Sequence, residues 1–367
     1  MGENMKSEAV LVLETGQVFP ARRFGAGGEI SAELVFTTAM VGYVETLTDP
    51  SYHGQIVVQT FPLIGNYGVM AEDFESAAPR LSAYIVRQHC DLPSNFRSET
   101  DLDSYLKASG VIGLYGVDTR ALTRIIRERG VMNAAILDEA PEDLPAFCKA
   151  LSEKALSSDV SQVTCSAPYS LGEGEKLVAL WDFGFKRGMA QAMIDRGYRV
   201  TVVPAHATCE EILALKPDGV LLSNGPGDPA VNHGIIREIK KLAETGTPIF
   251  GICLGHQLLA LAMGAKTEKL KYGHRGANQP ARDLKTGRLY ITSQNHGYQV
   301  VRDTLPEGAR ASFENANDLT NEGVEYDRVN AFTVQFHPEA RGGPLDTSFL
   351  FDQFSLRMEE CAHAAGN

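Results

Sequence analysis

The amino-acid sequence predicts an α/β protein with a β-rich α/β N-terminal domain and a second α/β domain built on a mostly parallel sheet. The chain has 367 residues and a hydrophobic content of 44%, which suffices for two domains that each bury a core. Residues 8–60 carry short or alternating apolar runs broken by Gly, Pro and Asp, as β-strands do. From about residue 176, apolar runs alternate with helical patterns, which favours parallel strands covered by helices.

The N-terminal half follows its β-rich stretch with two helical patterns. The first is "DTRALTRIIRERG", which Asp118 or Thr119 can cap and Gly130 can end, and the second lies around residues 142–157. A polar stretch rich in Ser, Gly and Pro follows, and it predicts an interdomain linker over residues 159–175. The expected domains are therefore residues 1–158 and 176–367.

The C-terminal half alternates strand-like and helix-like segments with short connections. Its predicted strands and helices are "LVALWDF", "RGMAQAMIDRGY", "RVTVVP", "EEILALK", "DGVLLSNG", "HGIIREIKKLAETG", "PIFGIC" and "GHQLLALAMG", and later strands precede a last helix near 346–361. In open α/β sheets, ligands bind beyond the carboxyl ends of the strands. Functional residues are therefore expected directly after the apolar runs.

The composition of the chain argues against several classes of binding partner. The net charge is -12, which argues against nucleic acid and anionic membranes because both are bound by clustered cations. The six cysteines show no C-x-x-C pairing, which suits a reducing compartment and predicts no zinc knuckle. We find no signal peptide and no run of about 18 apolar residues, so we expect a cytoplasmic protein. The chain has no phosphate loop, no H-E-x-x-H and no calcium loop, so we expect no metal and no ATP site in it.

Cys253 lies in the segment "GICLG", between Gly251 and Gly255, where an apolar run gives way to a helical pattern. A nucleophile on such a strand-to-helix turn has a strained backbone, and glycines two residues away on each side avoid steric clashes. The helix N-terminus favours the thiolate, and the N–H of Leu254 can donate to an oxyanion. The alternative is a buried core cysteine, because free cysteines are often buried.

His337 is the expected partner base. It ends the strand-like run "TVQFHPE", and Glu339 lies two residues later, where a carboxylate can orient the imidazole. The alternative for His337 is a hydrogen-bonded surface histidine.

The segment "LLSNGPGDPA" forms a third motif. Gly225, Gly227 and Ala230 match G-x-G-x-x-A, but two prolines stiffen the turn and the next strand lacks the acidic residue of a dinucleotide site. We interpret the segment as a rigid turn that presents backbone N–H groups, with Gly227 as a possible second oxyanion donor. The alternative is a plain tight turn.

Together, "SNGPGDP", "GICLGHQLLALAMGA", "SQNHGYQV" and "FTVQFHPE" resemble the class I, or triad, glutamine amidotransferases over residues 176–360. The resemblance implies a flavodoxin-like C-terminal domain in which Cys253 attacks the amide of L-glutamine, His337 transfers the proton and Glu339 holds His337. In the first half, "ETGQVFPARRFG", "ELVFTTAMVGYVETLTDPSYHGQIVVQTFPLIGNYG" and "GLYGVDTRALTRIIRERG" resemble the N-terminal domain of the carbamoyl-phosphate synthase small-subunit family.

This resemblance implies a glutamine-binding site and a partner. The implied glutamine-binding residues are Ser51, Gly225, Gly227, Leu254, Gln257, Asn295, Gly297 and Tyr298. Ser51 would bring the N-terminal domain into the site; without the family, a surface turn is its alternative. The implied partner is a large synthetase subunit that binds ATP and Mg²⁺, receives ammonia and makes carbamoyl phosphate from bicarbonate for arginine and pyrimidine biosynthesis. The resulting assembly would be a heterodimer, with no cofactor in this chain.

Two other functions are weighed against this one. The chain can be the amidotransferase subunit of a different synthetase, although its N-terminal half argues against that. It can also be an interaction subunit with an inactive site, although Cys253, His337 and Glu339 are all present.

Overall fold

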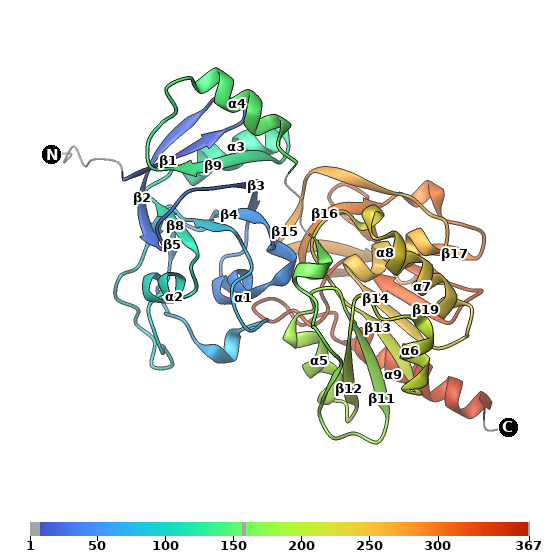
Figure 1. Ribbon diagram of the computed structural model, residues 1–367. Helices are drawn as coiled ribbons and strands as arrows, with labels where there is room; N and C mark the ends of the chain where they lie inside the picture. Colours follow the sequence, from blue (N-terminus) through green and yellow to red (C-terminus); the bar gives the residue numbers. More distant parts are fainter. Residues whose placement is uncertain (1–7, 156–158, 366–367) are drawn as a thin grey trace. The chain divides into compact units, whose positions relative to one another are not determined.

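The computed structural model describes residues 8–155 and 159–365, and the chain divides into two compact units, residues 1–158 and 159–367 (Figure 1). Both units contain helices and strands, and the first is rich in strands, as the sequence predicts. Among the described residues, no helix has both the length and the apolar character needed to cross a membrane.

The first unit is built around a closed β-barrel with the strand order β1-β2-β8-β6-β4-β3-β9. Strands β5 and β7 pair in parallel and form a separate two-stranded sheet. The strands are β1 (Ala9–Leu13), β2 (Val18–Gly25), β3 (Ile30–Thr37), β4 (Gln55–Gln59), β5 (Leu63–Ile64), β6 (Ala83–Ile85), β7 (Gln88–His89), β8 (Ile112–Tyr115) and β9 (Met132–Leu137).

The helices of the first unit cover apolar side chains of this barrel. They are α1 (Tyr43–Thr48), α2 (Leu102–Ala108), α3 (Thr119–Arg129) and α4 (Leu144–Glu153). Tyr43 and Leu47 of α1 and Leu102 of α2 pack with barrel residues such as Val57 and Tyr84 in one buried cluster. The helix predicted from "DTRALTRIIRERG" is confirmed as α3, whose N-cap Asp118 accepts a hydrogen bond from the N–H of Ala121.

The second unit contains a ten-stranded sheet in its described part, with the order β10-β12-β11-β13-β14-β19-β18-β17-β15-β16. Strands β12, β11, β13, β14 and β19 run parallel to one another, whereas β10 pairs antiparallel with β12 and the strands beyond β19 are antiparallel. The strands are β10 (Tyr169–Leu171), β11 (Leu177–Asp182), β12 (Arg199–Pro204), β13 (Gly219–Leu222), β14 (Ile249–Ile252), β15 (Thr267–Asp283), β16 (Leu289–Val300), β17 (Ala309–Asn315), β18 (Asn321–Tyr326) and β19 (Ala331–Val334).

Helices cover both faces of the parallel strands (Figure 1). The helices are α5 (Arg187–Ile194), α6 (Cys209–Ala214), α7 (His233–Ala243), α8 (Leu254–Ala262) and α9 (Phe349–Ala365). Trp181 of β11 packs in a cluster with α6, α7 and α8, whereas its neighbour Leu180 packs in a second cluster with α5 and α9. Successive side chains of a strand point to opposite faces, so each face of the sheet has its own core.

Residues 159–175, for which the sequence predicts a linker, group with the second unit instead. Tyr169–Leu171 forms β10, which pairs antiparallel with β12 and extends the sheet. The strand is only three residues long and lies among Ser, Pro and Gly residues, so sequence analysis does not detect it, and its backbone hydrogen bonds to β12 form whichever side chains the edge strand carries.

Candidate active site

The predicted catalytic residues follow adjacent parallel strands. Cys253 comes directly after β14, and His337 comes three positions after the last residue of β19. These strands pair in parallel with Ile252 opposite Val334, and the N–H of Cys253 donates to the carbonyl of Val334 at 2.9 Å. The carboxyl ends of neighbouring parallel strands lie at the same edge of a sheet, so the fold brings both residues to one edge.

Cys253 has a strained backbone, with φ 54° and ψ −102° at the start of α8. The flanking glycines make this turn possible. A Cβ on Gly255 would lie 2.4 Å from the carbonyl oxygen of Leu222, and one on Gly251 would lie 2.8 Å from Cγ2 of Thr333. No side chain fits at either position, because β14 and α8 pack too closely against their neighbours. The strand–nucleophile–helix turn predicted from "GICLG" is therefore present.

The thiol of Cys253 is buried at the sheet edge. The residue is 2% exposed, and its Sγ lies 3.6 Å from the carbonyl oxygen of Asn295 on β16. Cys253 is thus buried, as the core alternative requires, but an ordinary core cysteine has no reason to adopt a positive φ. Leu254 is the first residue of α8, so its N–H is among those without a partner inside the helix and lies next to the thiol.

His337 and Glu339 form the pair that the sequence predicts. His337 Nδ1 lies 2.7 Å from Glu339 Oε1, and both side chains are buried. Because a carboxylate oxygen accepts, the proton of the neutral imidazole lies on Nδ1 and the lone pair on Nε2. This Nε2 is buried and has no hydrogen-bond partner among the described residues. His337 therefore presents a base with no competing donor, which contradicts its surface alternative.

Lys186 completes this arrangement, and sequence analysis missed it. Its Nζ lies 2.7 Å from Glu339 Oε1, and the ammonium is almost as buried as the carboxylate. Burial favours the neutral form of Glu339, but the charge of Lys186 and the hydrogen bonds from His337 and Lys186 outweigh it and lower the pKa of Glu339 to about 2. Lys186 follows β11 at the same sheet edge, so its place after the run "LVALWDF" was a signal that could have identified it.

The turn after β13 carries two of the predicted glutamine-binding residues. A Cβ on Gly225 would lie 2.2 Å from the carbonyl oxygen of Phe183 and 2.7 Å from Cδ2 of Leu254, so Gly225 packs directly against Leu254. Gly227 has φ 86°, a conformation that favours glycine. The rigid turn predicted from "SNGPGDP" is thus present next to the start of α8.

The remaining predicted residues of the second unit lie on α8 and β16. Gln257 Nε2 donates to the carbonyl of Tyr298 at 2.9 Å and to Oε1 of Gln335 at 3.0 Å. Asn295 is 8% exposed and supplies the carbonyl that faces the Cys253 thiol. Gly297 lies between Asn295 and Tyr298 on β16. The structure therefore gathers this segment, Gln257 and Cys253 in one place.

Ser51 lies in the first unit, within a short 3₁₀ helix over Pro50–Tyr52. It is 8% exposed, and its N–H donates to the side chain of Asp49 at 2.9 Å. Ser51 is thus part of a structured and buried turn, which differs from the surface turn that its alternative supposes.

Comparisons with known proteins identify the family. The family described as glutamine amidotransferase class-I matches residues 179–356, and the carbamoyl-phosphate synthase small chain, CPSase domain, matches residues 11–136. The carbamoyl phosphate synthase small chain of Syntrophotalea carbinolica is 45% identical over 98% of this chain and 100% of its own length. This chain belongs to the carbamoyl phosphate synthase small chain family.

Other members of this family are equally similar. The carbamoyl phosphate synthase small chain of Clostridium perfringens is 49% identical and covers 95% of this chain and 98% of its own length. The carbamoyl phosphate synthase pyrimidine-specific small chain of Bacillus subtilis is 49% identical and covers 95% of both chains. The predicted family and the class I amidotransferase domain in the second unit are therefore confirmed.

Proposed function

We propose that this chain is the glutaminase subunit of a glutamine-hydrolysing carbamoyl-phosphate synthase, in which a Cys253–His337–Glu339 triad converts L-glutamine to glutamate and ammonia. One observation carries the proposal: a strained cysteine and a carboxylate-held histidine follow adjacent parallel strands, and the Nε2 of this histidine has no partner in the described part of the chain. A core cysteine would not need a strained backbone, and a surface histidine would not need a buried carboxylate partner.

In the first step, the Sγ of Cys253 forms a bond to the side-chain amide carbon of glutamine. The electron pair of the C=O bond moves to the oxygen, where the N–H groups of Leu254 and Gly227 donate to the oxyanion. His337 Nε2 takes the thiol proton and passes it to the amide nitrogen. The C–N bond then breaks, ammonia leaves, and a thioester remains on Cys253.

In the second step, water hydrolyses the thioester. His337 Nε2 takes a proton from the water, whose oxygen attacks the carbonyl carbon. The C–S bond breaks, glutamate leaves, and the proton returns to the sulfur of Cys253. Glu339 remains ionised throughout and holds His337 in the tautomer with a free Nε2, while Lys186 keeps Glu339 ionised.

We further propose that glutamine binds to Gly225, Gly227, Leu254, Gln257, Asn295, Gly297 and Tyr298, with Ser51 of the first unit as an additional ligand. The zwitterionic head of glutamine requires amide, hydroxyl and backbone partners, which this set supplies. Gln257 already holds the backbone of Tyr298, which keeps that segment in position for a ligand.

The proposed partner is a large synthetase subunit, which forms a heterodimer with this chain, binds ATP and Mg²⁺ and receives ammonia for carbamoyl phosphate synthesis. The product would serve arginine and pyrimidine biosynthesis, and two of the relatives carry pyrimidine-specific names. The free cysteines suit a reducing compartment, so we place this reaction in the cytoplasm.

The test measures glutamate release from glutamine by the full chain, with and without a large subunit. We compare wild type with Cys253→Ala and with the control Cys209→Ala, which removes another buried thiol. We expect activity that rises with the large subunit, falls at least about 1,000-fold in Cys253→Ala and persists in Cys209→Ala. Equal activity in wild type and Cys253→Ala would refute the triad.

A second measurement tests the coupling to synthesis. In the complex, Cys253→Ser should abolish glutamine-driven carbamoyl phosphate formation and leave ammonia-driven formation intact. An inactive wild-type chain that still binds the large subunit would identify an interaction subunit instead. Glutaminase activity that no carbamoyl-phosphate-forming partner stimulates would indicate a different synthetase.

A further inference from the structure

Two buried amide side chains, Gln257 on α8 and Gln335 directly after β19, contact each other next to the proposed active site. Gln257 comes one helical turn after Cys253, and its N–H donates to the carbonyl of Cys253 at 3.2 Å. Gln335 comes two residues before His337 and is fully buried. Residues four positions apart lie on the same face of a helix, so the Gln257 side chain lies on the side of α8 that begins with Cys253.

Both N–H bonds of the Gln257 amide are in use. Its Nε2 donates to the carbonyl of Tyr298 at 2.9 Å and to Oε1 of Gln335 at 3.0 Å. A backbone carbonyl only accepts, so Tyr298 fixes which end of the Gln257 amide is nitrogen, and this nitrogen fixes which end of Gln335 is oxygen. Gln257 Oε1 accepts no hydrogen bond from the described residues. Gln257 therefore offers a ligand an acceptor and no donor.

The carbonyl of Tyr298 alone does not hold the Gln257 amide in this orientation. His296 Nδ1 lies 2.8 Å from the same carbonyl oxygen and donates to it, since the oxygen only accepts. If the Gln257 amide turned away, the carbonyl of Tyr298 would keep this second donor. The hydrogen bond to Gln335 is therefore the contact that makes the orientation of the Gln257 amide unique.

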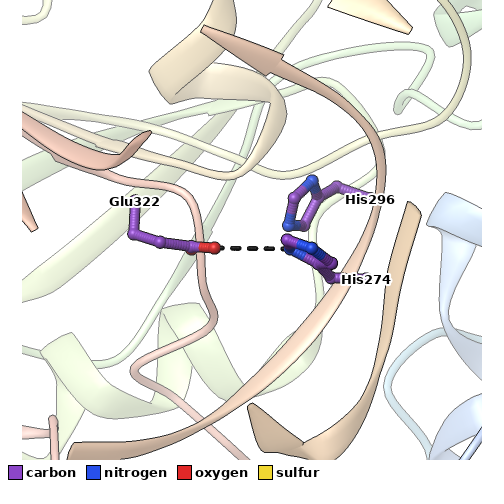
Figure 2. Close-up of side chains that lie close together, drawn as sticks. All are labelled: His274, His296 and Glu322. Carbon is purple, nitrogen blue, oxygen red and sulfur yellow. Dashed lines mark ion pairs between the residues drawn. The ribbon is translucent and has the colours of Figure 1, made fainter. Parts of the chain in front are cut away.

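The Gln335 side chain makes no other hydrogen bond within the described residues, where its buried Nε2 has no partner. The N–H of Gln335 donates to the carbonyl of Glu322 at 2.9 Å, so Glu322 is its neighbour on β18. Oε1 of Glu322 faces His274 (Figure 2) and accepts from Asn315 Nδ2 at 3.2 Å, and neither carboxylate oxygen accepts from Gln335. A buried amide donor without an acceptor lowers stability. Stability therefore does not explain this side chain, whereas its hydrogen bond to Gln257 does.

L-Glutamine has two groups that can donate to Gln257 Oε1, its side-chain amide and its α-ammonium. In the proposed reaction, the amide carbon lies at the Sγ of Cys253. The ammonium nitrogen of an extended glutamine lies about 5 Å from this carbon, four bonds away. Four residues of helix rise about 6 Å, so the ammonium reaches Gln257 when the amide reaches Cys253. A hydrogen bond from an ammonium is charge-assisted and is stronger than one between neutral groups.

We propose that Gln335 is a positioning residue, which turns the oxygen of Gln257 toward the α-ammonium of bound L-glutamine. This inference rests on the glutaminase function proposed above. Gln335 does not touch the substrate but selects which end of the Gln257 amide the substrate meets. A site with its acceptor held in this way rejects an amide that lacks the ammonium, because the acceptor is then left unpaired.

The test compares glutamine hydrolysis by wild type and Gln335→Met in the complex with the large subunit. Methionine is unbranched like glutamine, and the substitution exchanges an unpartnered donor on Gln335 for one on Gln257, so the Tm should stay close to that of wild type. We expect the KM for glutamine to rise at least about 10-fold and kcat to stay within about twofold. The control Gln59→Met removes a fully buried amide of the first unit, which bonds Tyr84 and the carbonyl of Ala39, and should leave KM unchanged.

A second substrate separates positioning from a structural role. Glutaramate is L-glutamine without the α-ammonium, and wild type should hydrolyse it with a kcat/KM at least about 100-fold lower. Gln335→Met should lower kcat/KM for glutamine but not for glutaramate. Equal kcat/KM of wild type for both amides, which requires no variant, would overturn the proposal, and so would equal losses for both amides in Gln335→Met.

The same measurements distinguish this proposal from the proposed function. A wild-type complex without glutaminase activity would refute the function itself. Hydrolysis that depends on Cys253, with the same KM in wild type and Gln335→Met, would refute only the role of Gln335.

Discussion

The buried ion pair between Lys186 and Glu339 gives a quantitative prediction about the stability of the second unit. A pKa lowered from 4.5 to about 2 corresponds to about 3 kcal/mol of stabilisation of the folded state, since one pKa unit corresponds to about 1.4 kcal/mol. Burial raises this pKa, and the charge of Lys186 is the largest effect that lowers it. We therefore expect Lys186→Met to lower the free energy of unfolding by about 3 kcal/mol at pH 7, as removal of one partner of a buried pair does.

The expected pH dependence follows from the sign of the shift. The folded pKa of Glu339 lies below its unfolded value, so its contribution is complete above pH 4.5 and is lost as the pH falls towards about 2. The difference between wild type and Lys186→Met should therefore be largest near pH 7 and shrink as the pH falls below 4.5.

Urea unfolding followed by tryptophan fluorescence measures this difference. Trp181 is the only tryptophan of the chain and is fully buried in β11, so the signal reports the second unit. The control is Lys176→Met, the same chemical change at a pair with Glu359 in which both side chains are about half exposed. We expect a small effect there, because solvent screens exposed pairs. Equal effects of the two substitutions, or a difference that does not change below pH 4.5, would refute this reasoning.

Three further predictions concern the strand–helix turn and its buried histidine. Gly255→Ala should lower the Tm and the glutaminase activity, because the added Cβ would lie 2.4 Å from the carbonyl oxygen of Leu222. Thermal unfolding measures this effect, and an unchanged Tm would contradict the prediction. Cys253→Gly should raise the free energy of unfolding by about 1 kcal/mol, because glycine relieves the strain at φ 54°, and it should abolish activity because it removes the thiol. Cys209→Gly is the control and should lower the free energy of unfolding. Burial lowers the pKa of His256 from 6.5 to about 3, so only the unfolded state binds a proton at this histidine as the pH falls below 6.5. The free energy of unfolding of wild type should therefore fall by up to about 1.4 kcal/mol per pH unit because of His256, and His256→Asn should lack this decrease in acid unfolding. An identical acid dependence in both proteins would show that His256 does not cause it.

Sequence analysis located the residues that follow apolar parallel strands. The runs that form β11, β13, β14 and β19 are nearly continuous in apolar residues because both faces of these strands are buried. Such runs are easy to recognise, and the residues at their ends, such as Cys253 and His337, are then placed by the geometry of a parallel sheet.

The antiparallel part of the second unit was much harder to predict. Strand β15 covers Thr267–Asp283, a polar segment that contains Pro280 and has little regular alternation. Its cross-strand hydrogen bonds to β16 hold it, and they are invisible in a single sequence. The closing of the first unit into a barrel and the convergence of His274, His296 and Glu322 likewise depend on pairing between strands that are distant in the sequence.

The order of the parallel strands explains why the proposed catalytic groups come from distant parts of the sequence. Strands β11, β13, β14 and β19 are successive neighbours in the sheet, and they are followed by Lys186, the Gly225 turn, Cys253 and His337. Backbone pairing with β19 fixes Cys253, and the N–H of His337 donates to the carbonyl of Ser293 at 2.9 Å. These contacts do not depend on side chains, so sheet pairing holds the proposed nucleophile and the proposed base in place. Substitutions that weaken the pairing of β14, β19 or β16 should therefore impair catalysis even where they leave every catalytic side chain unchanged.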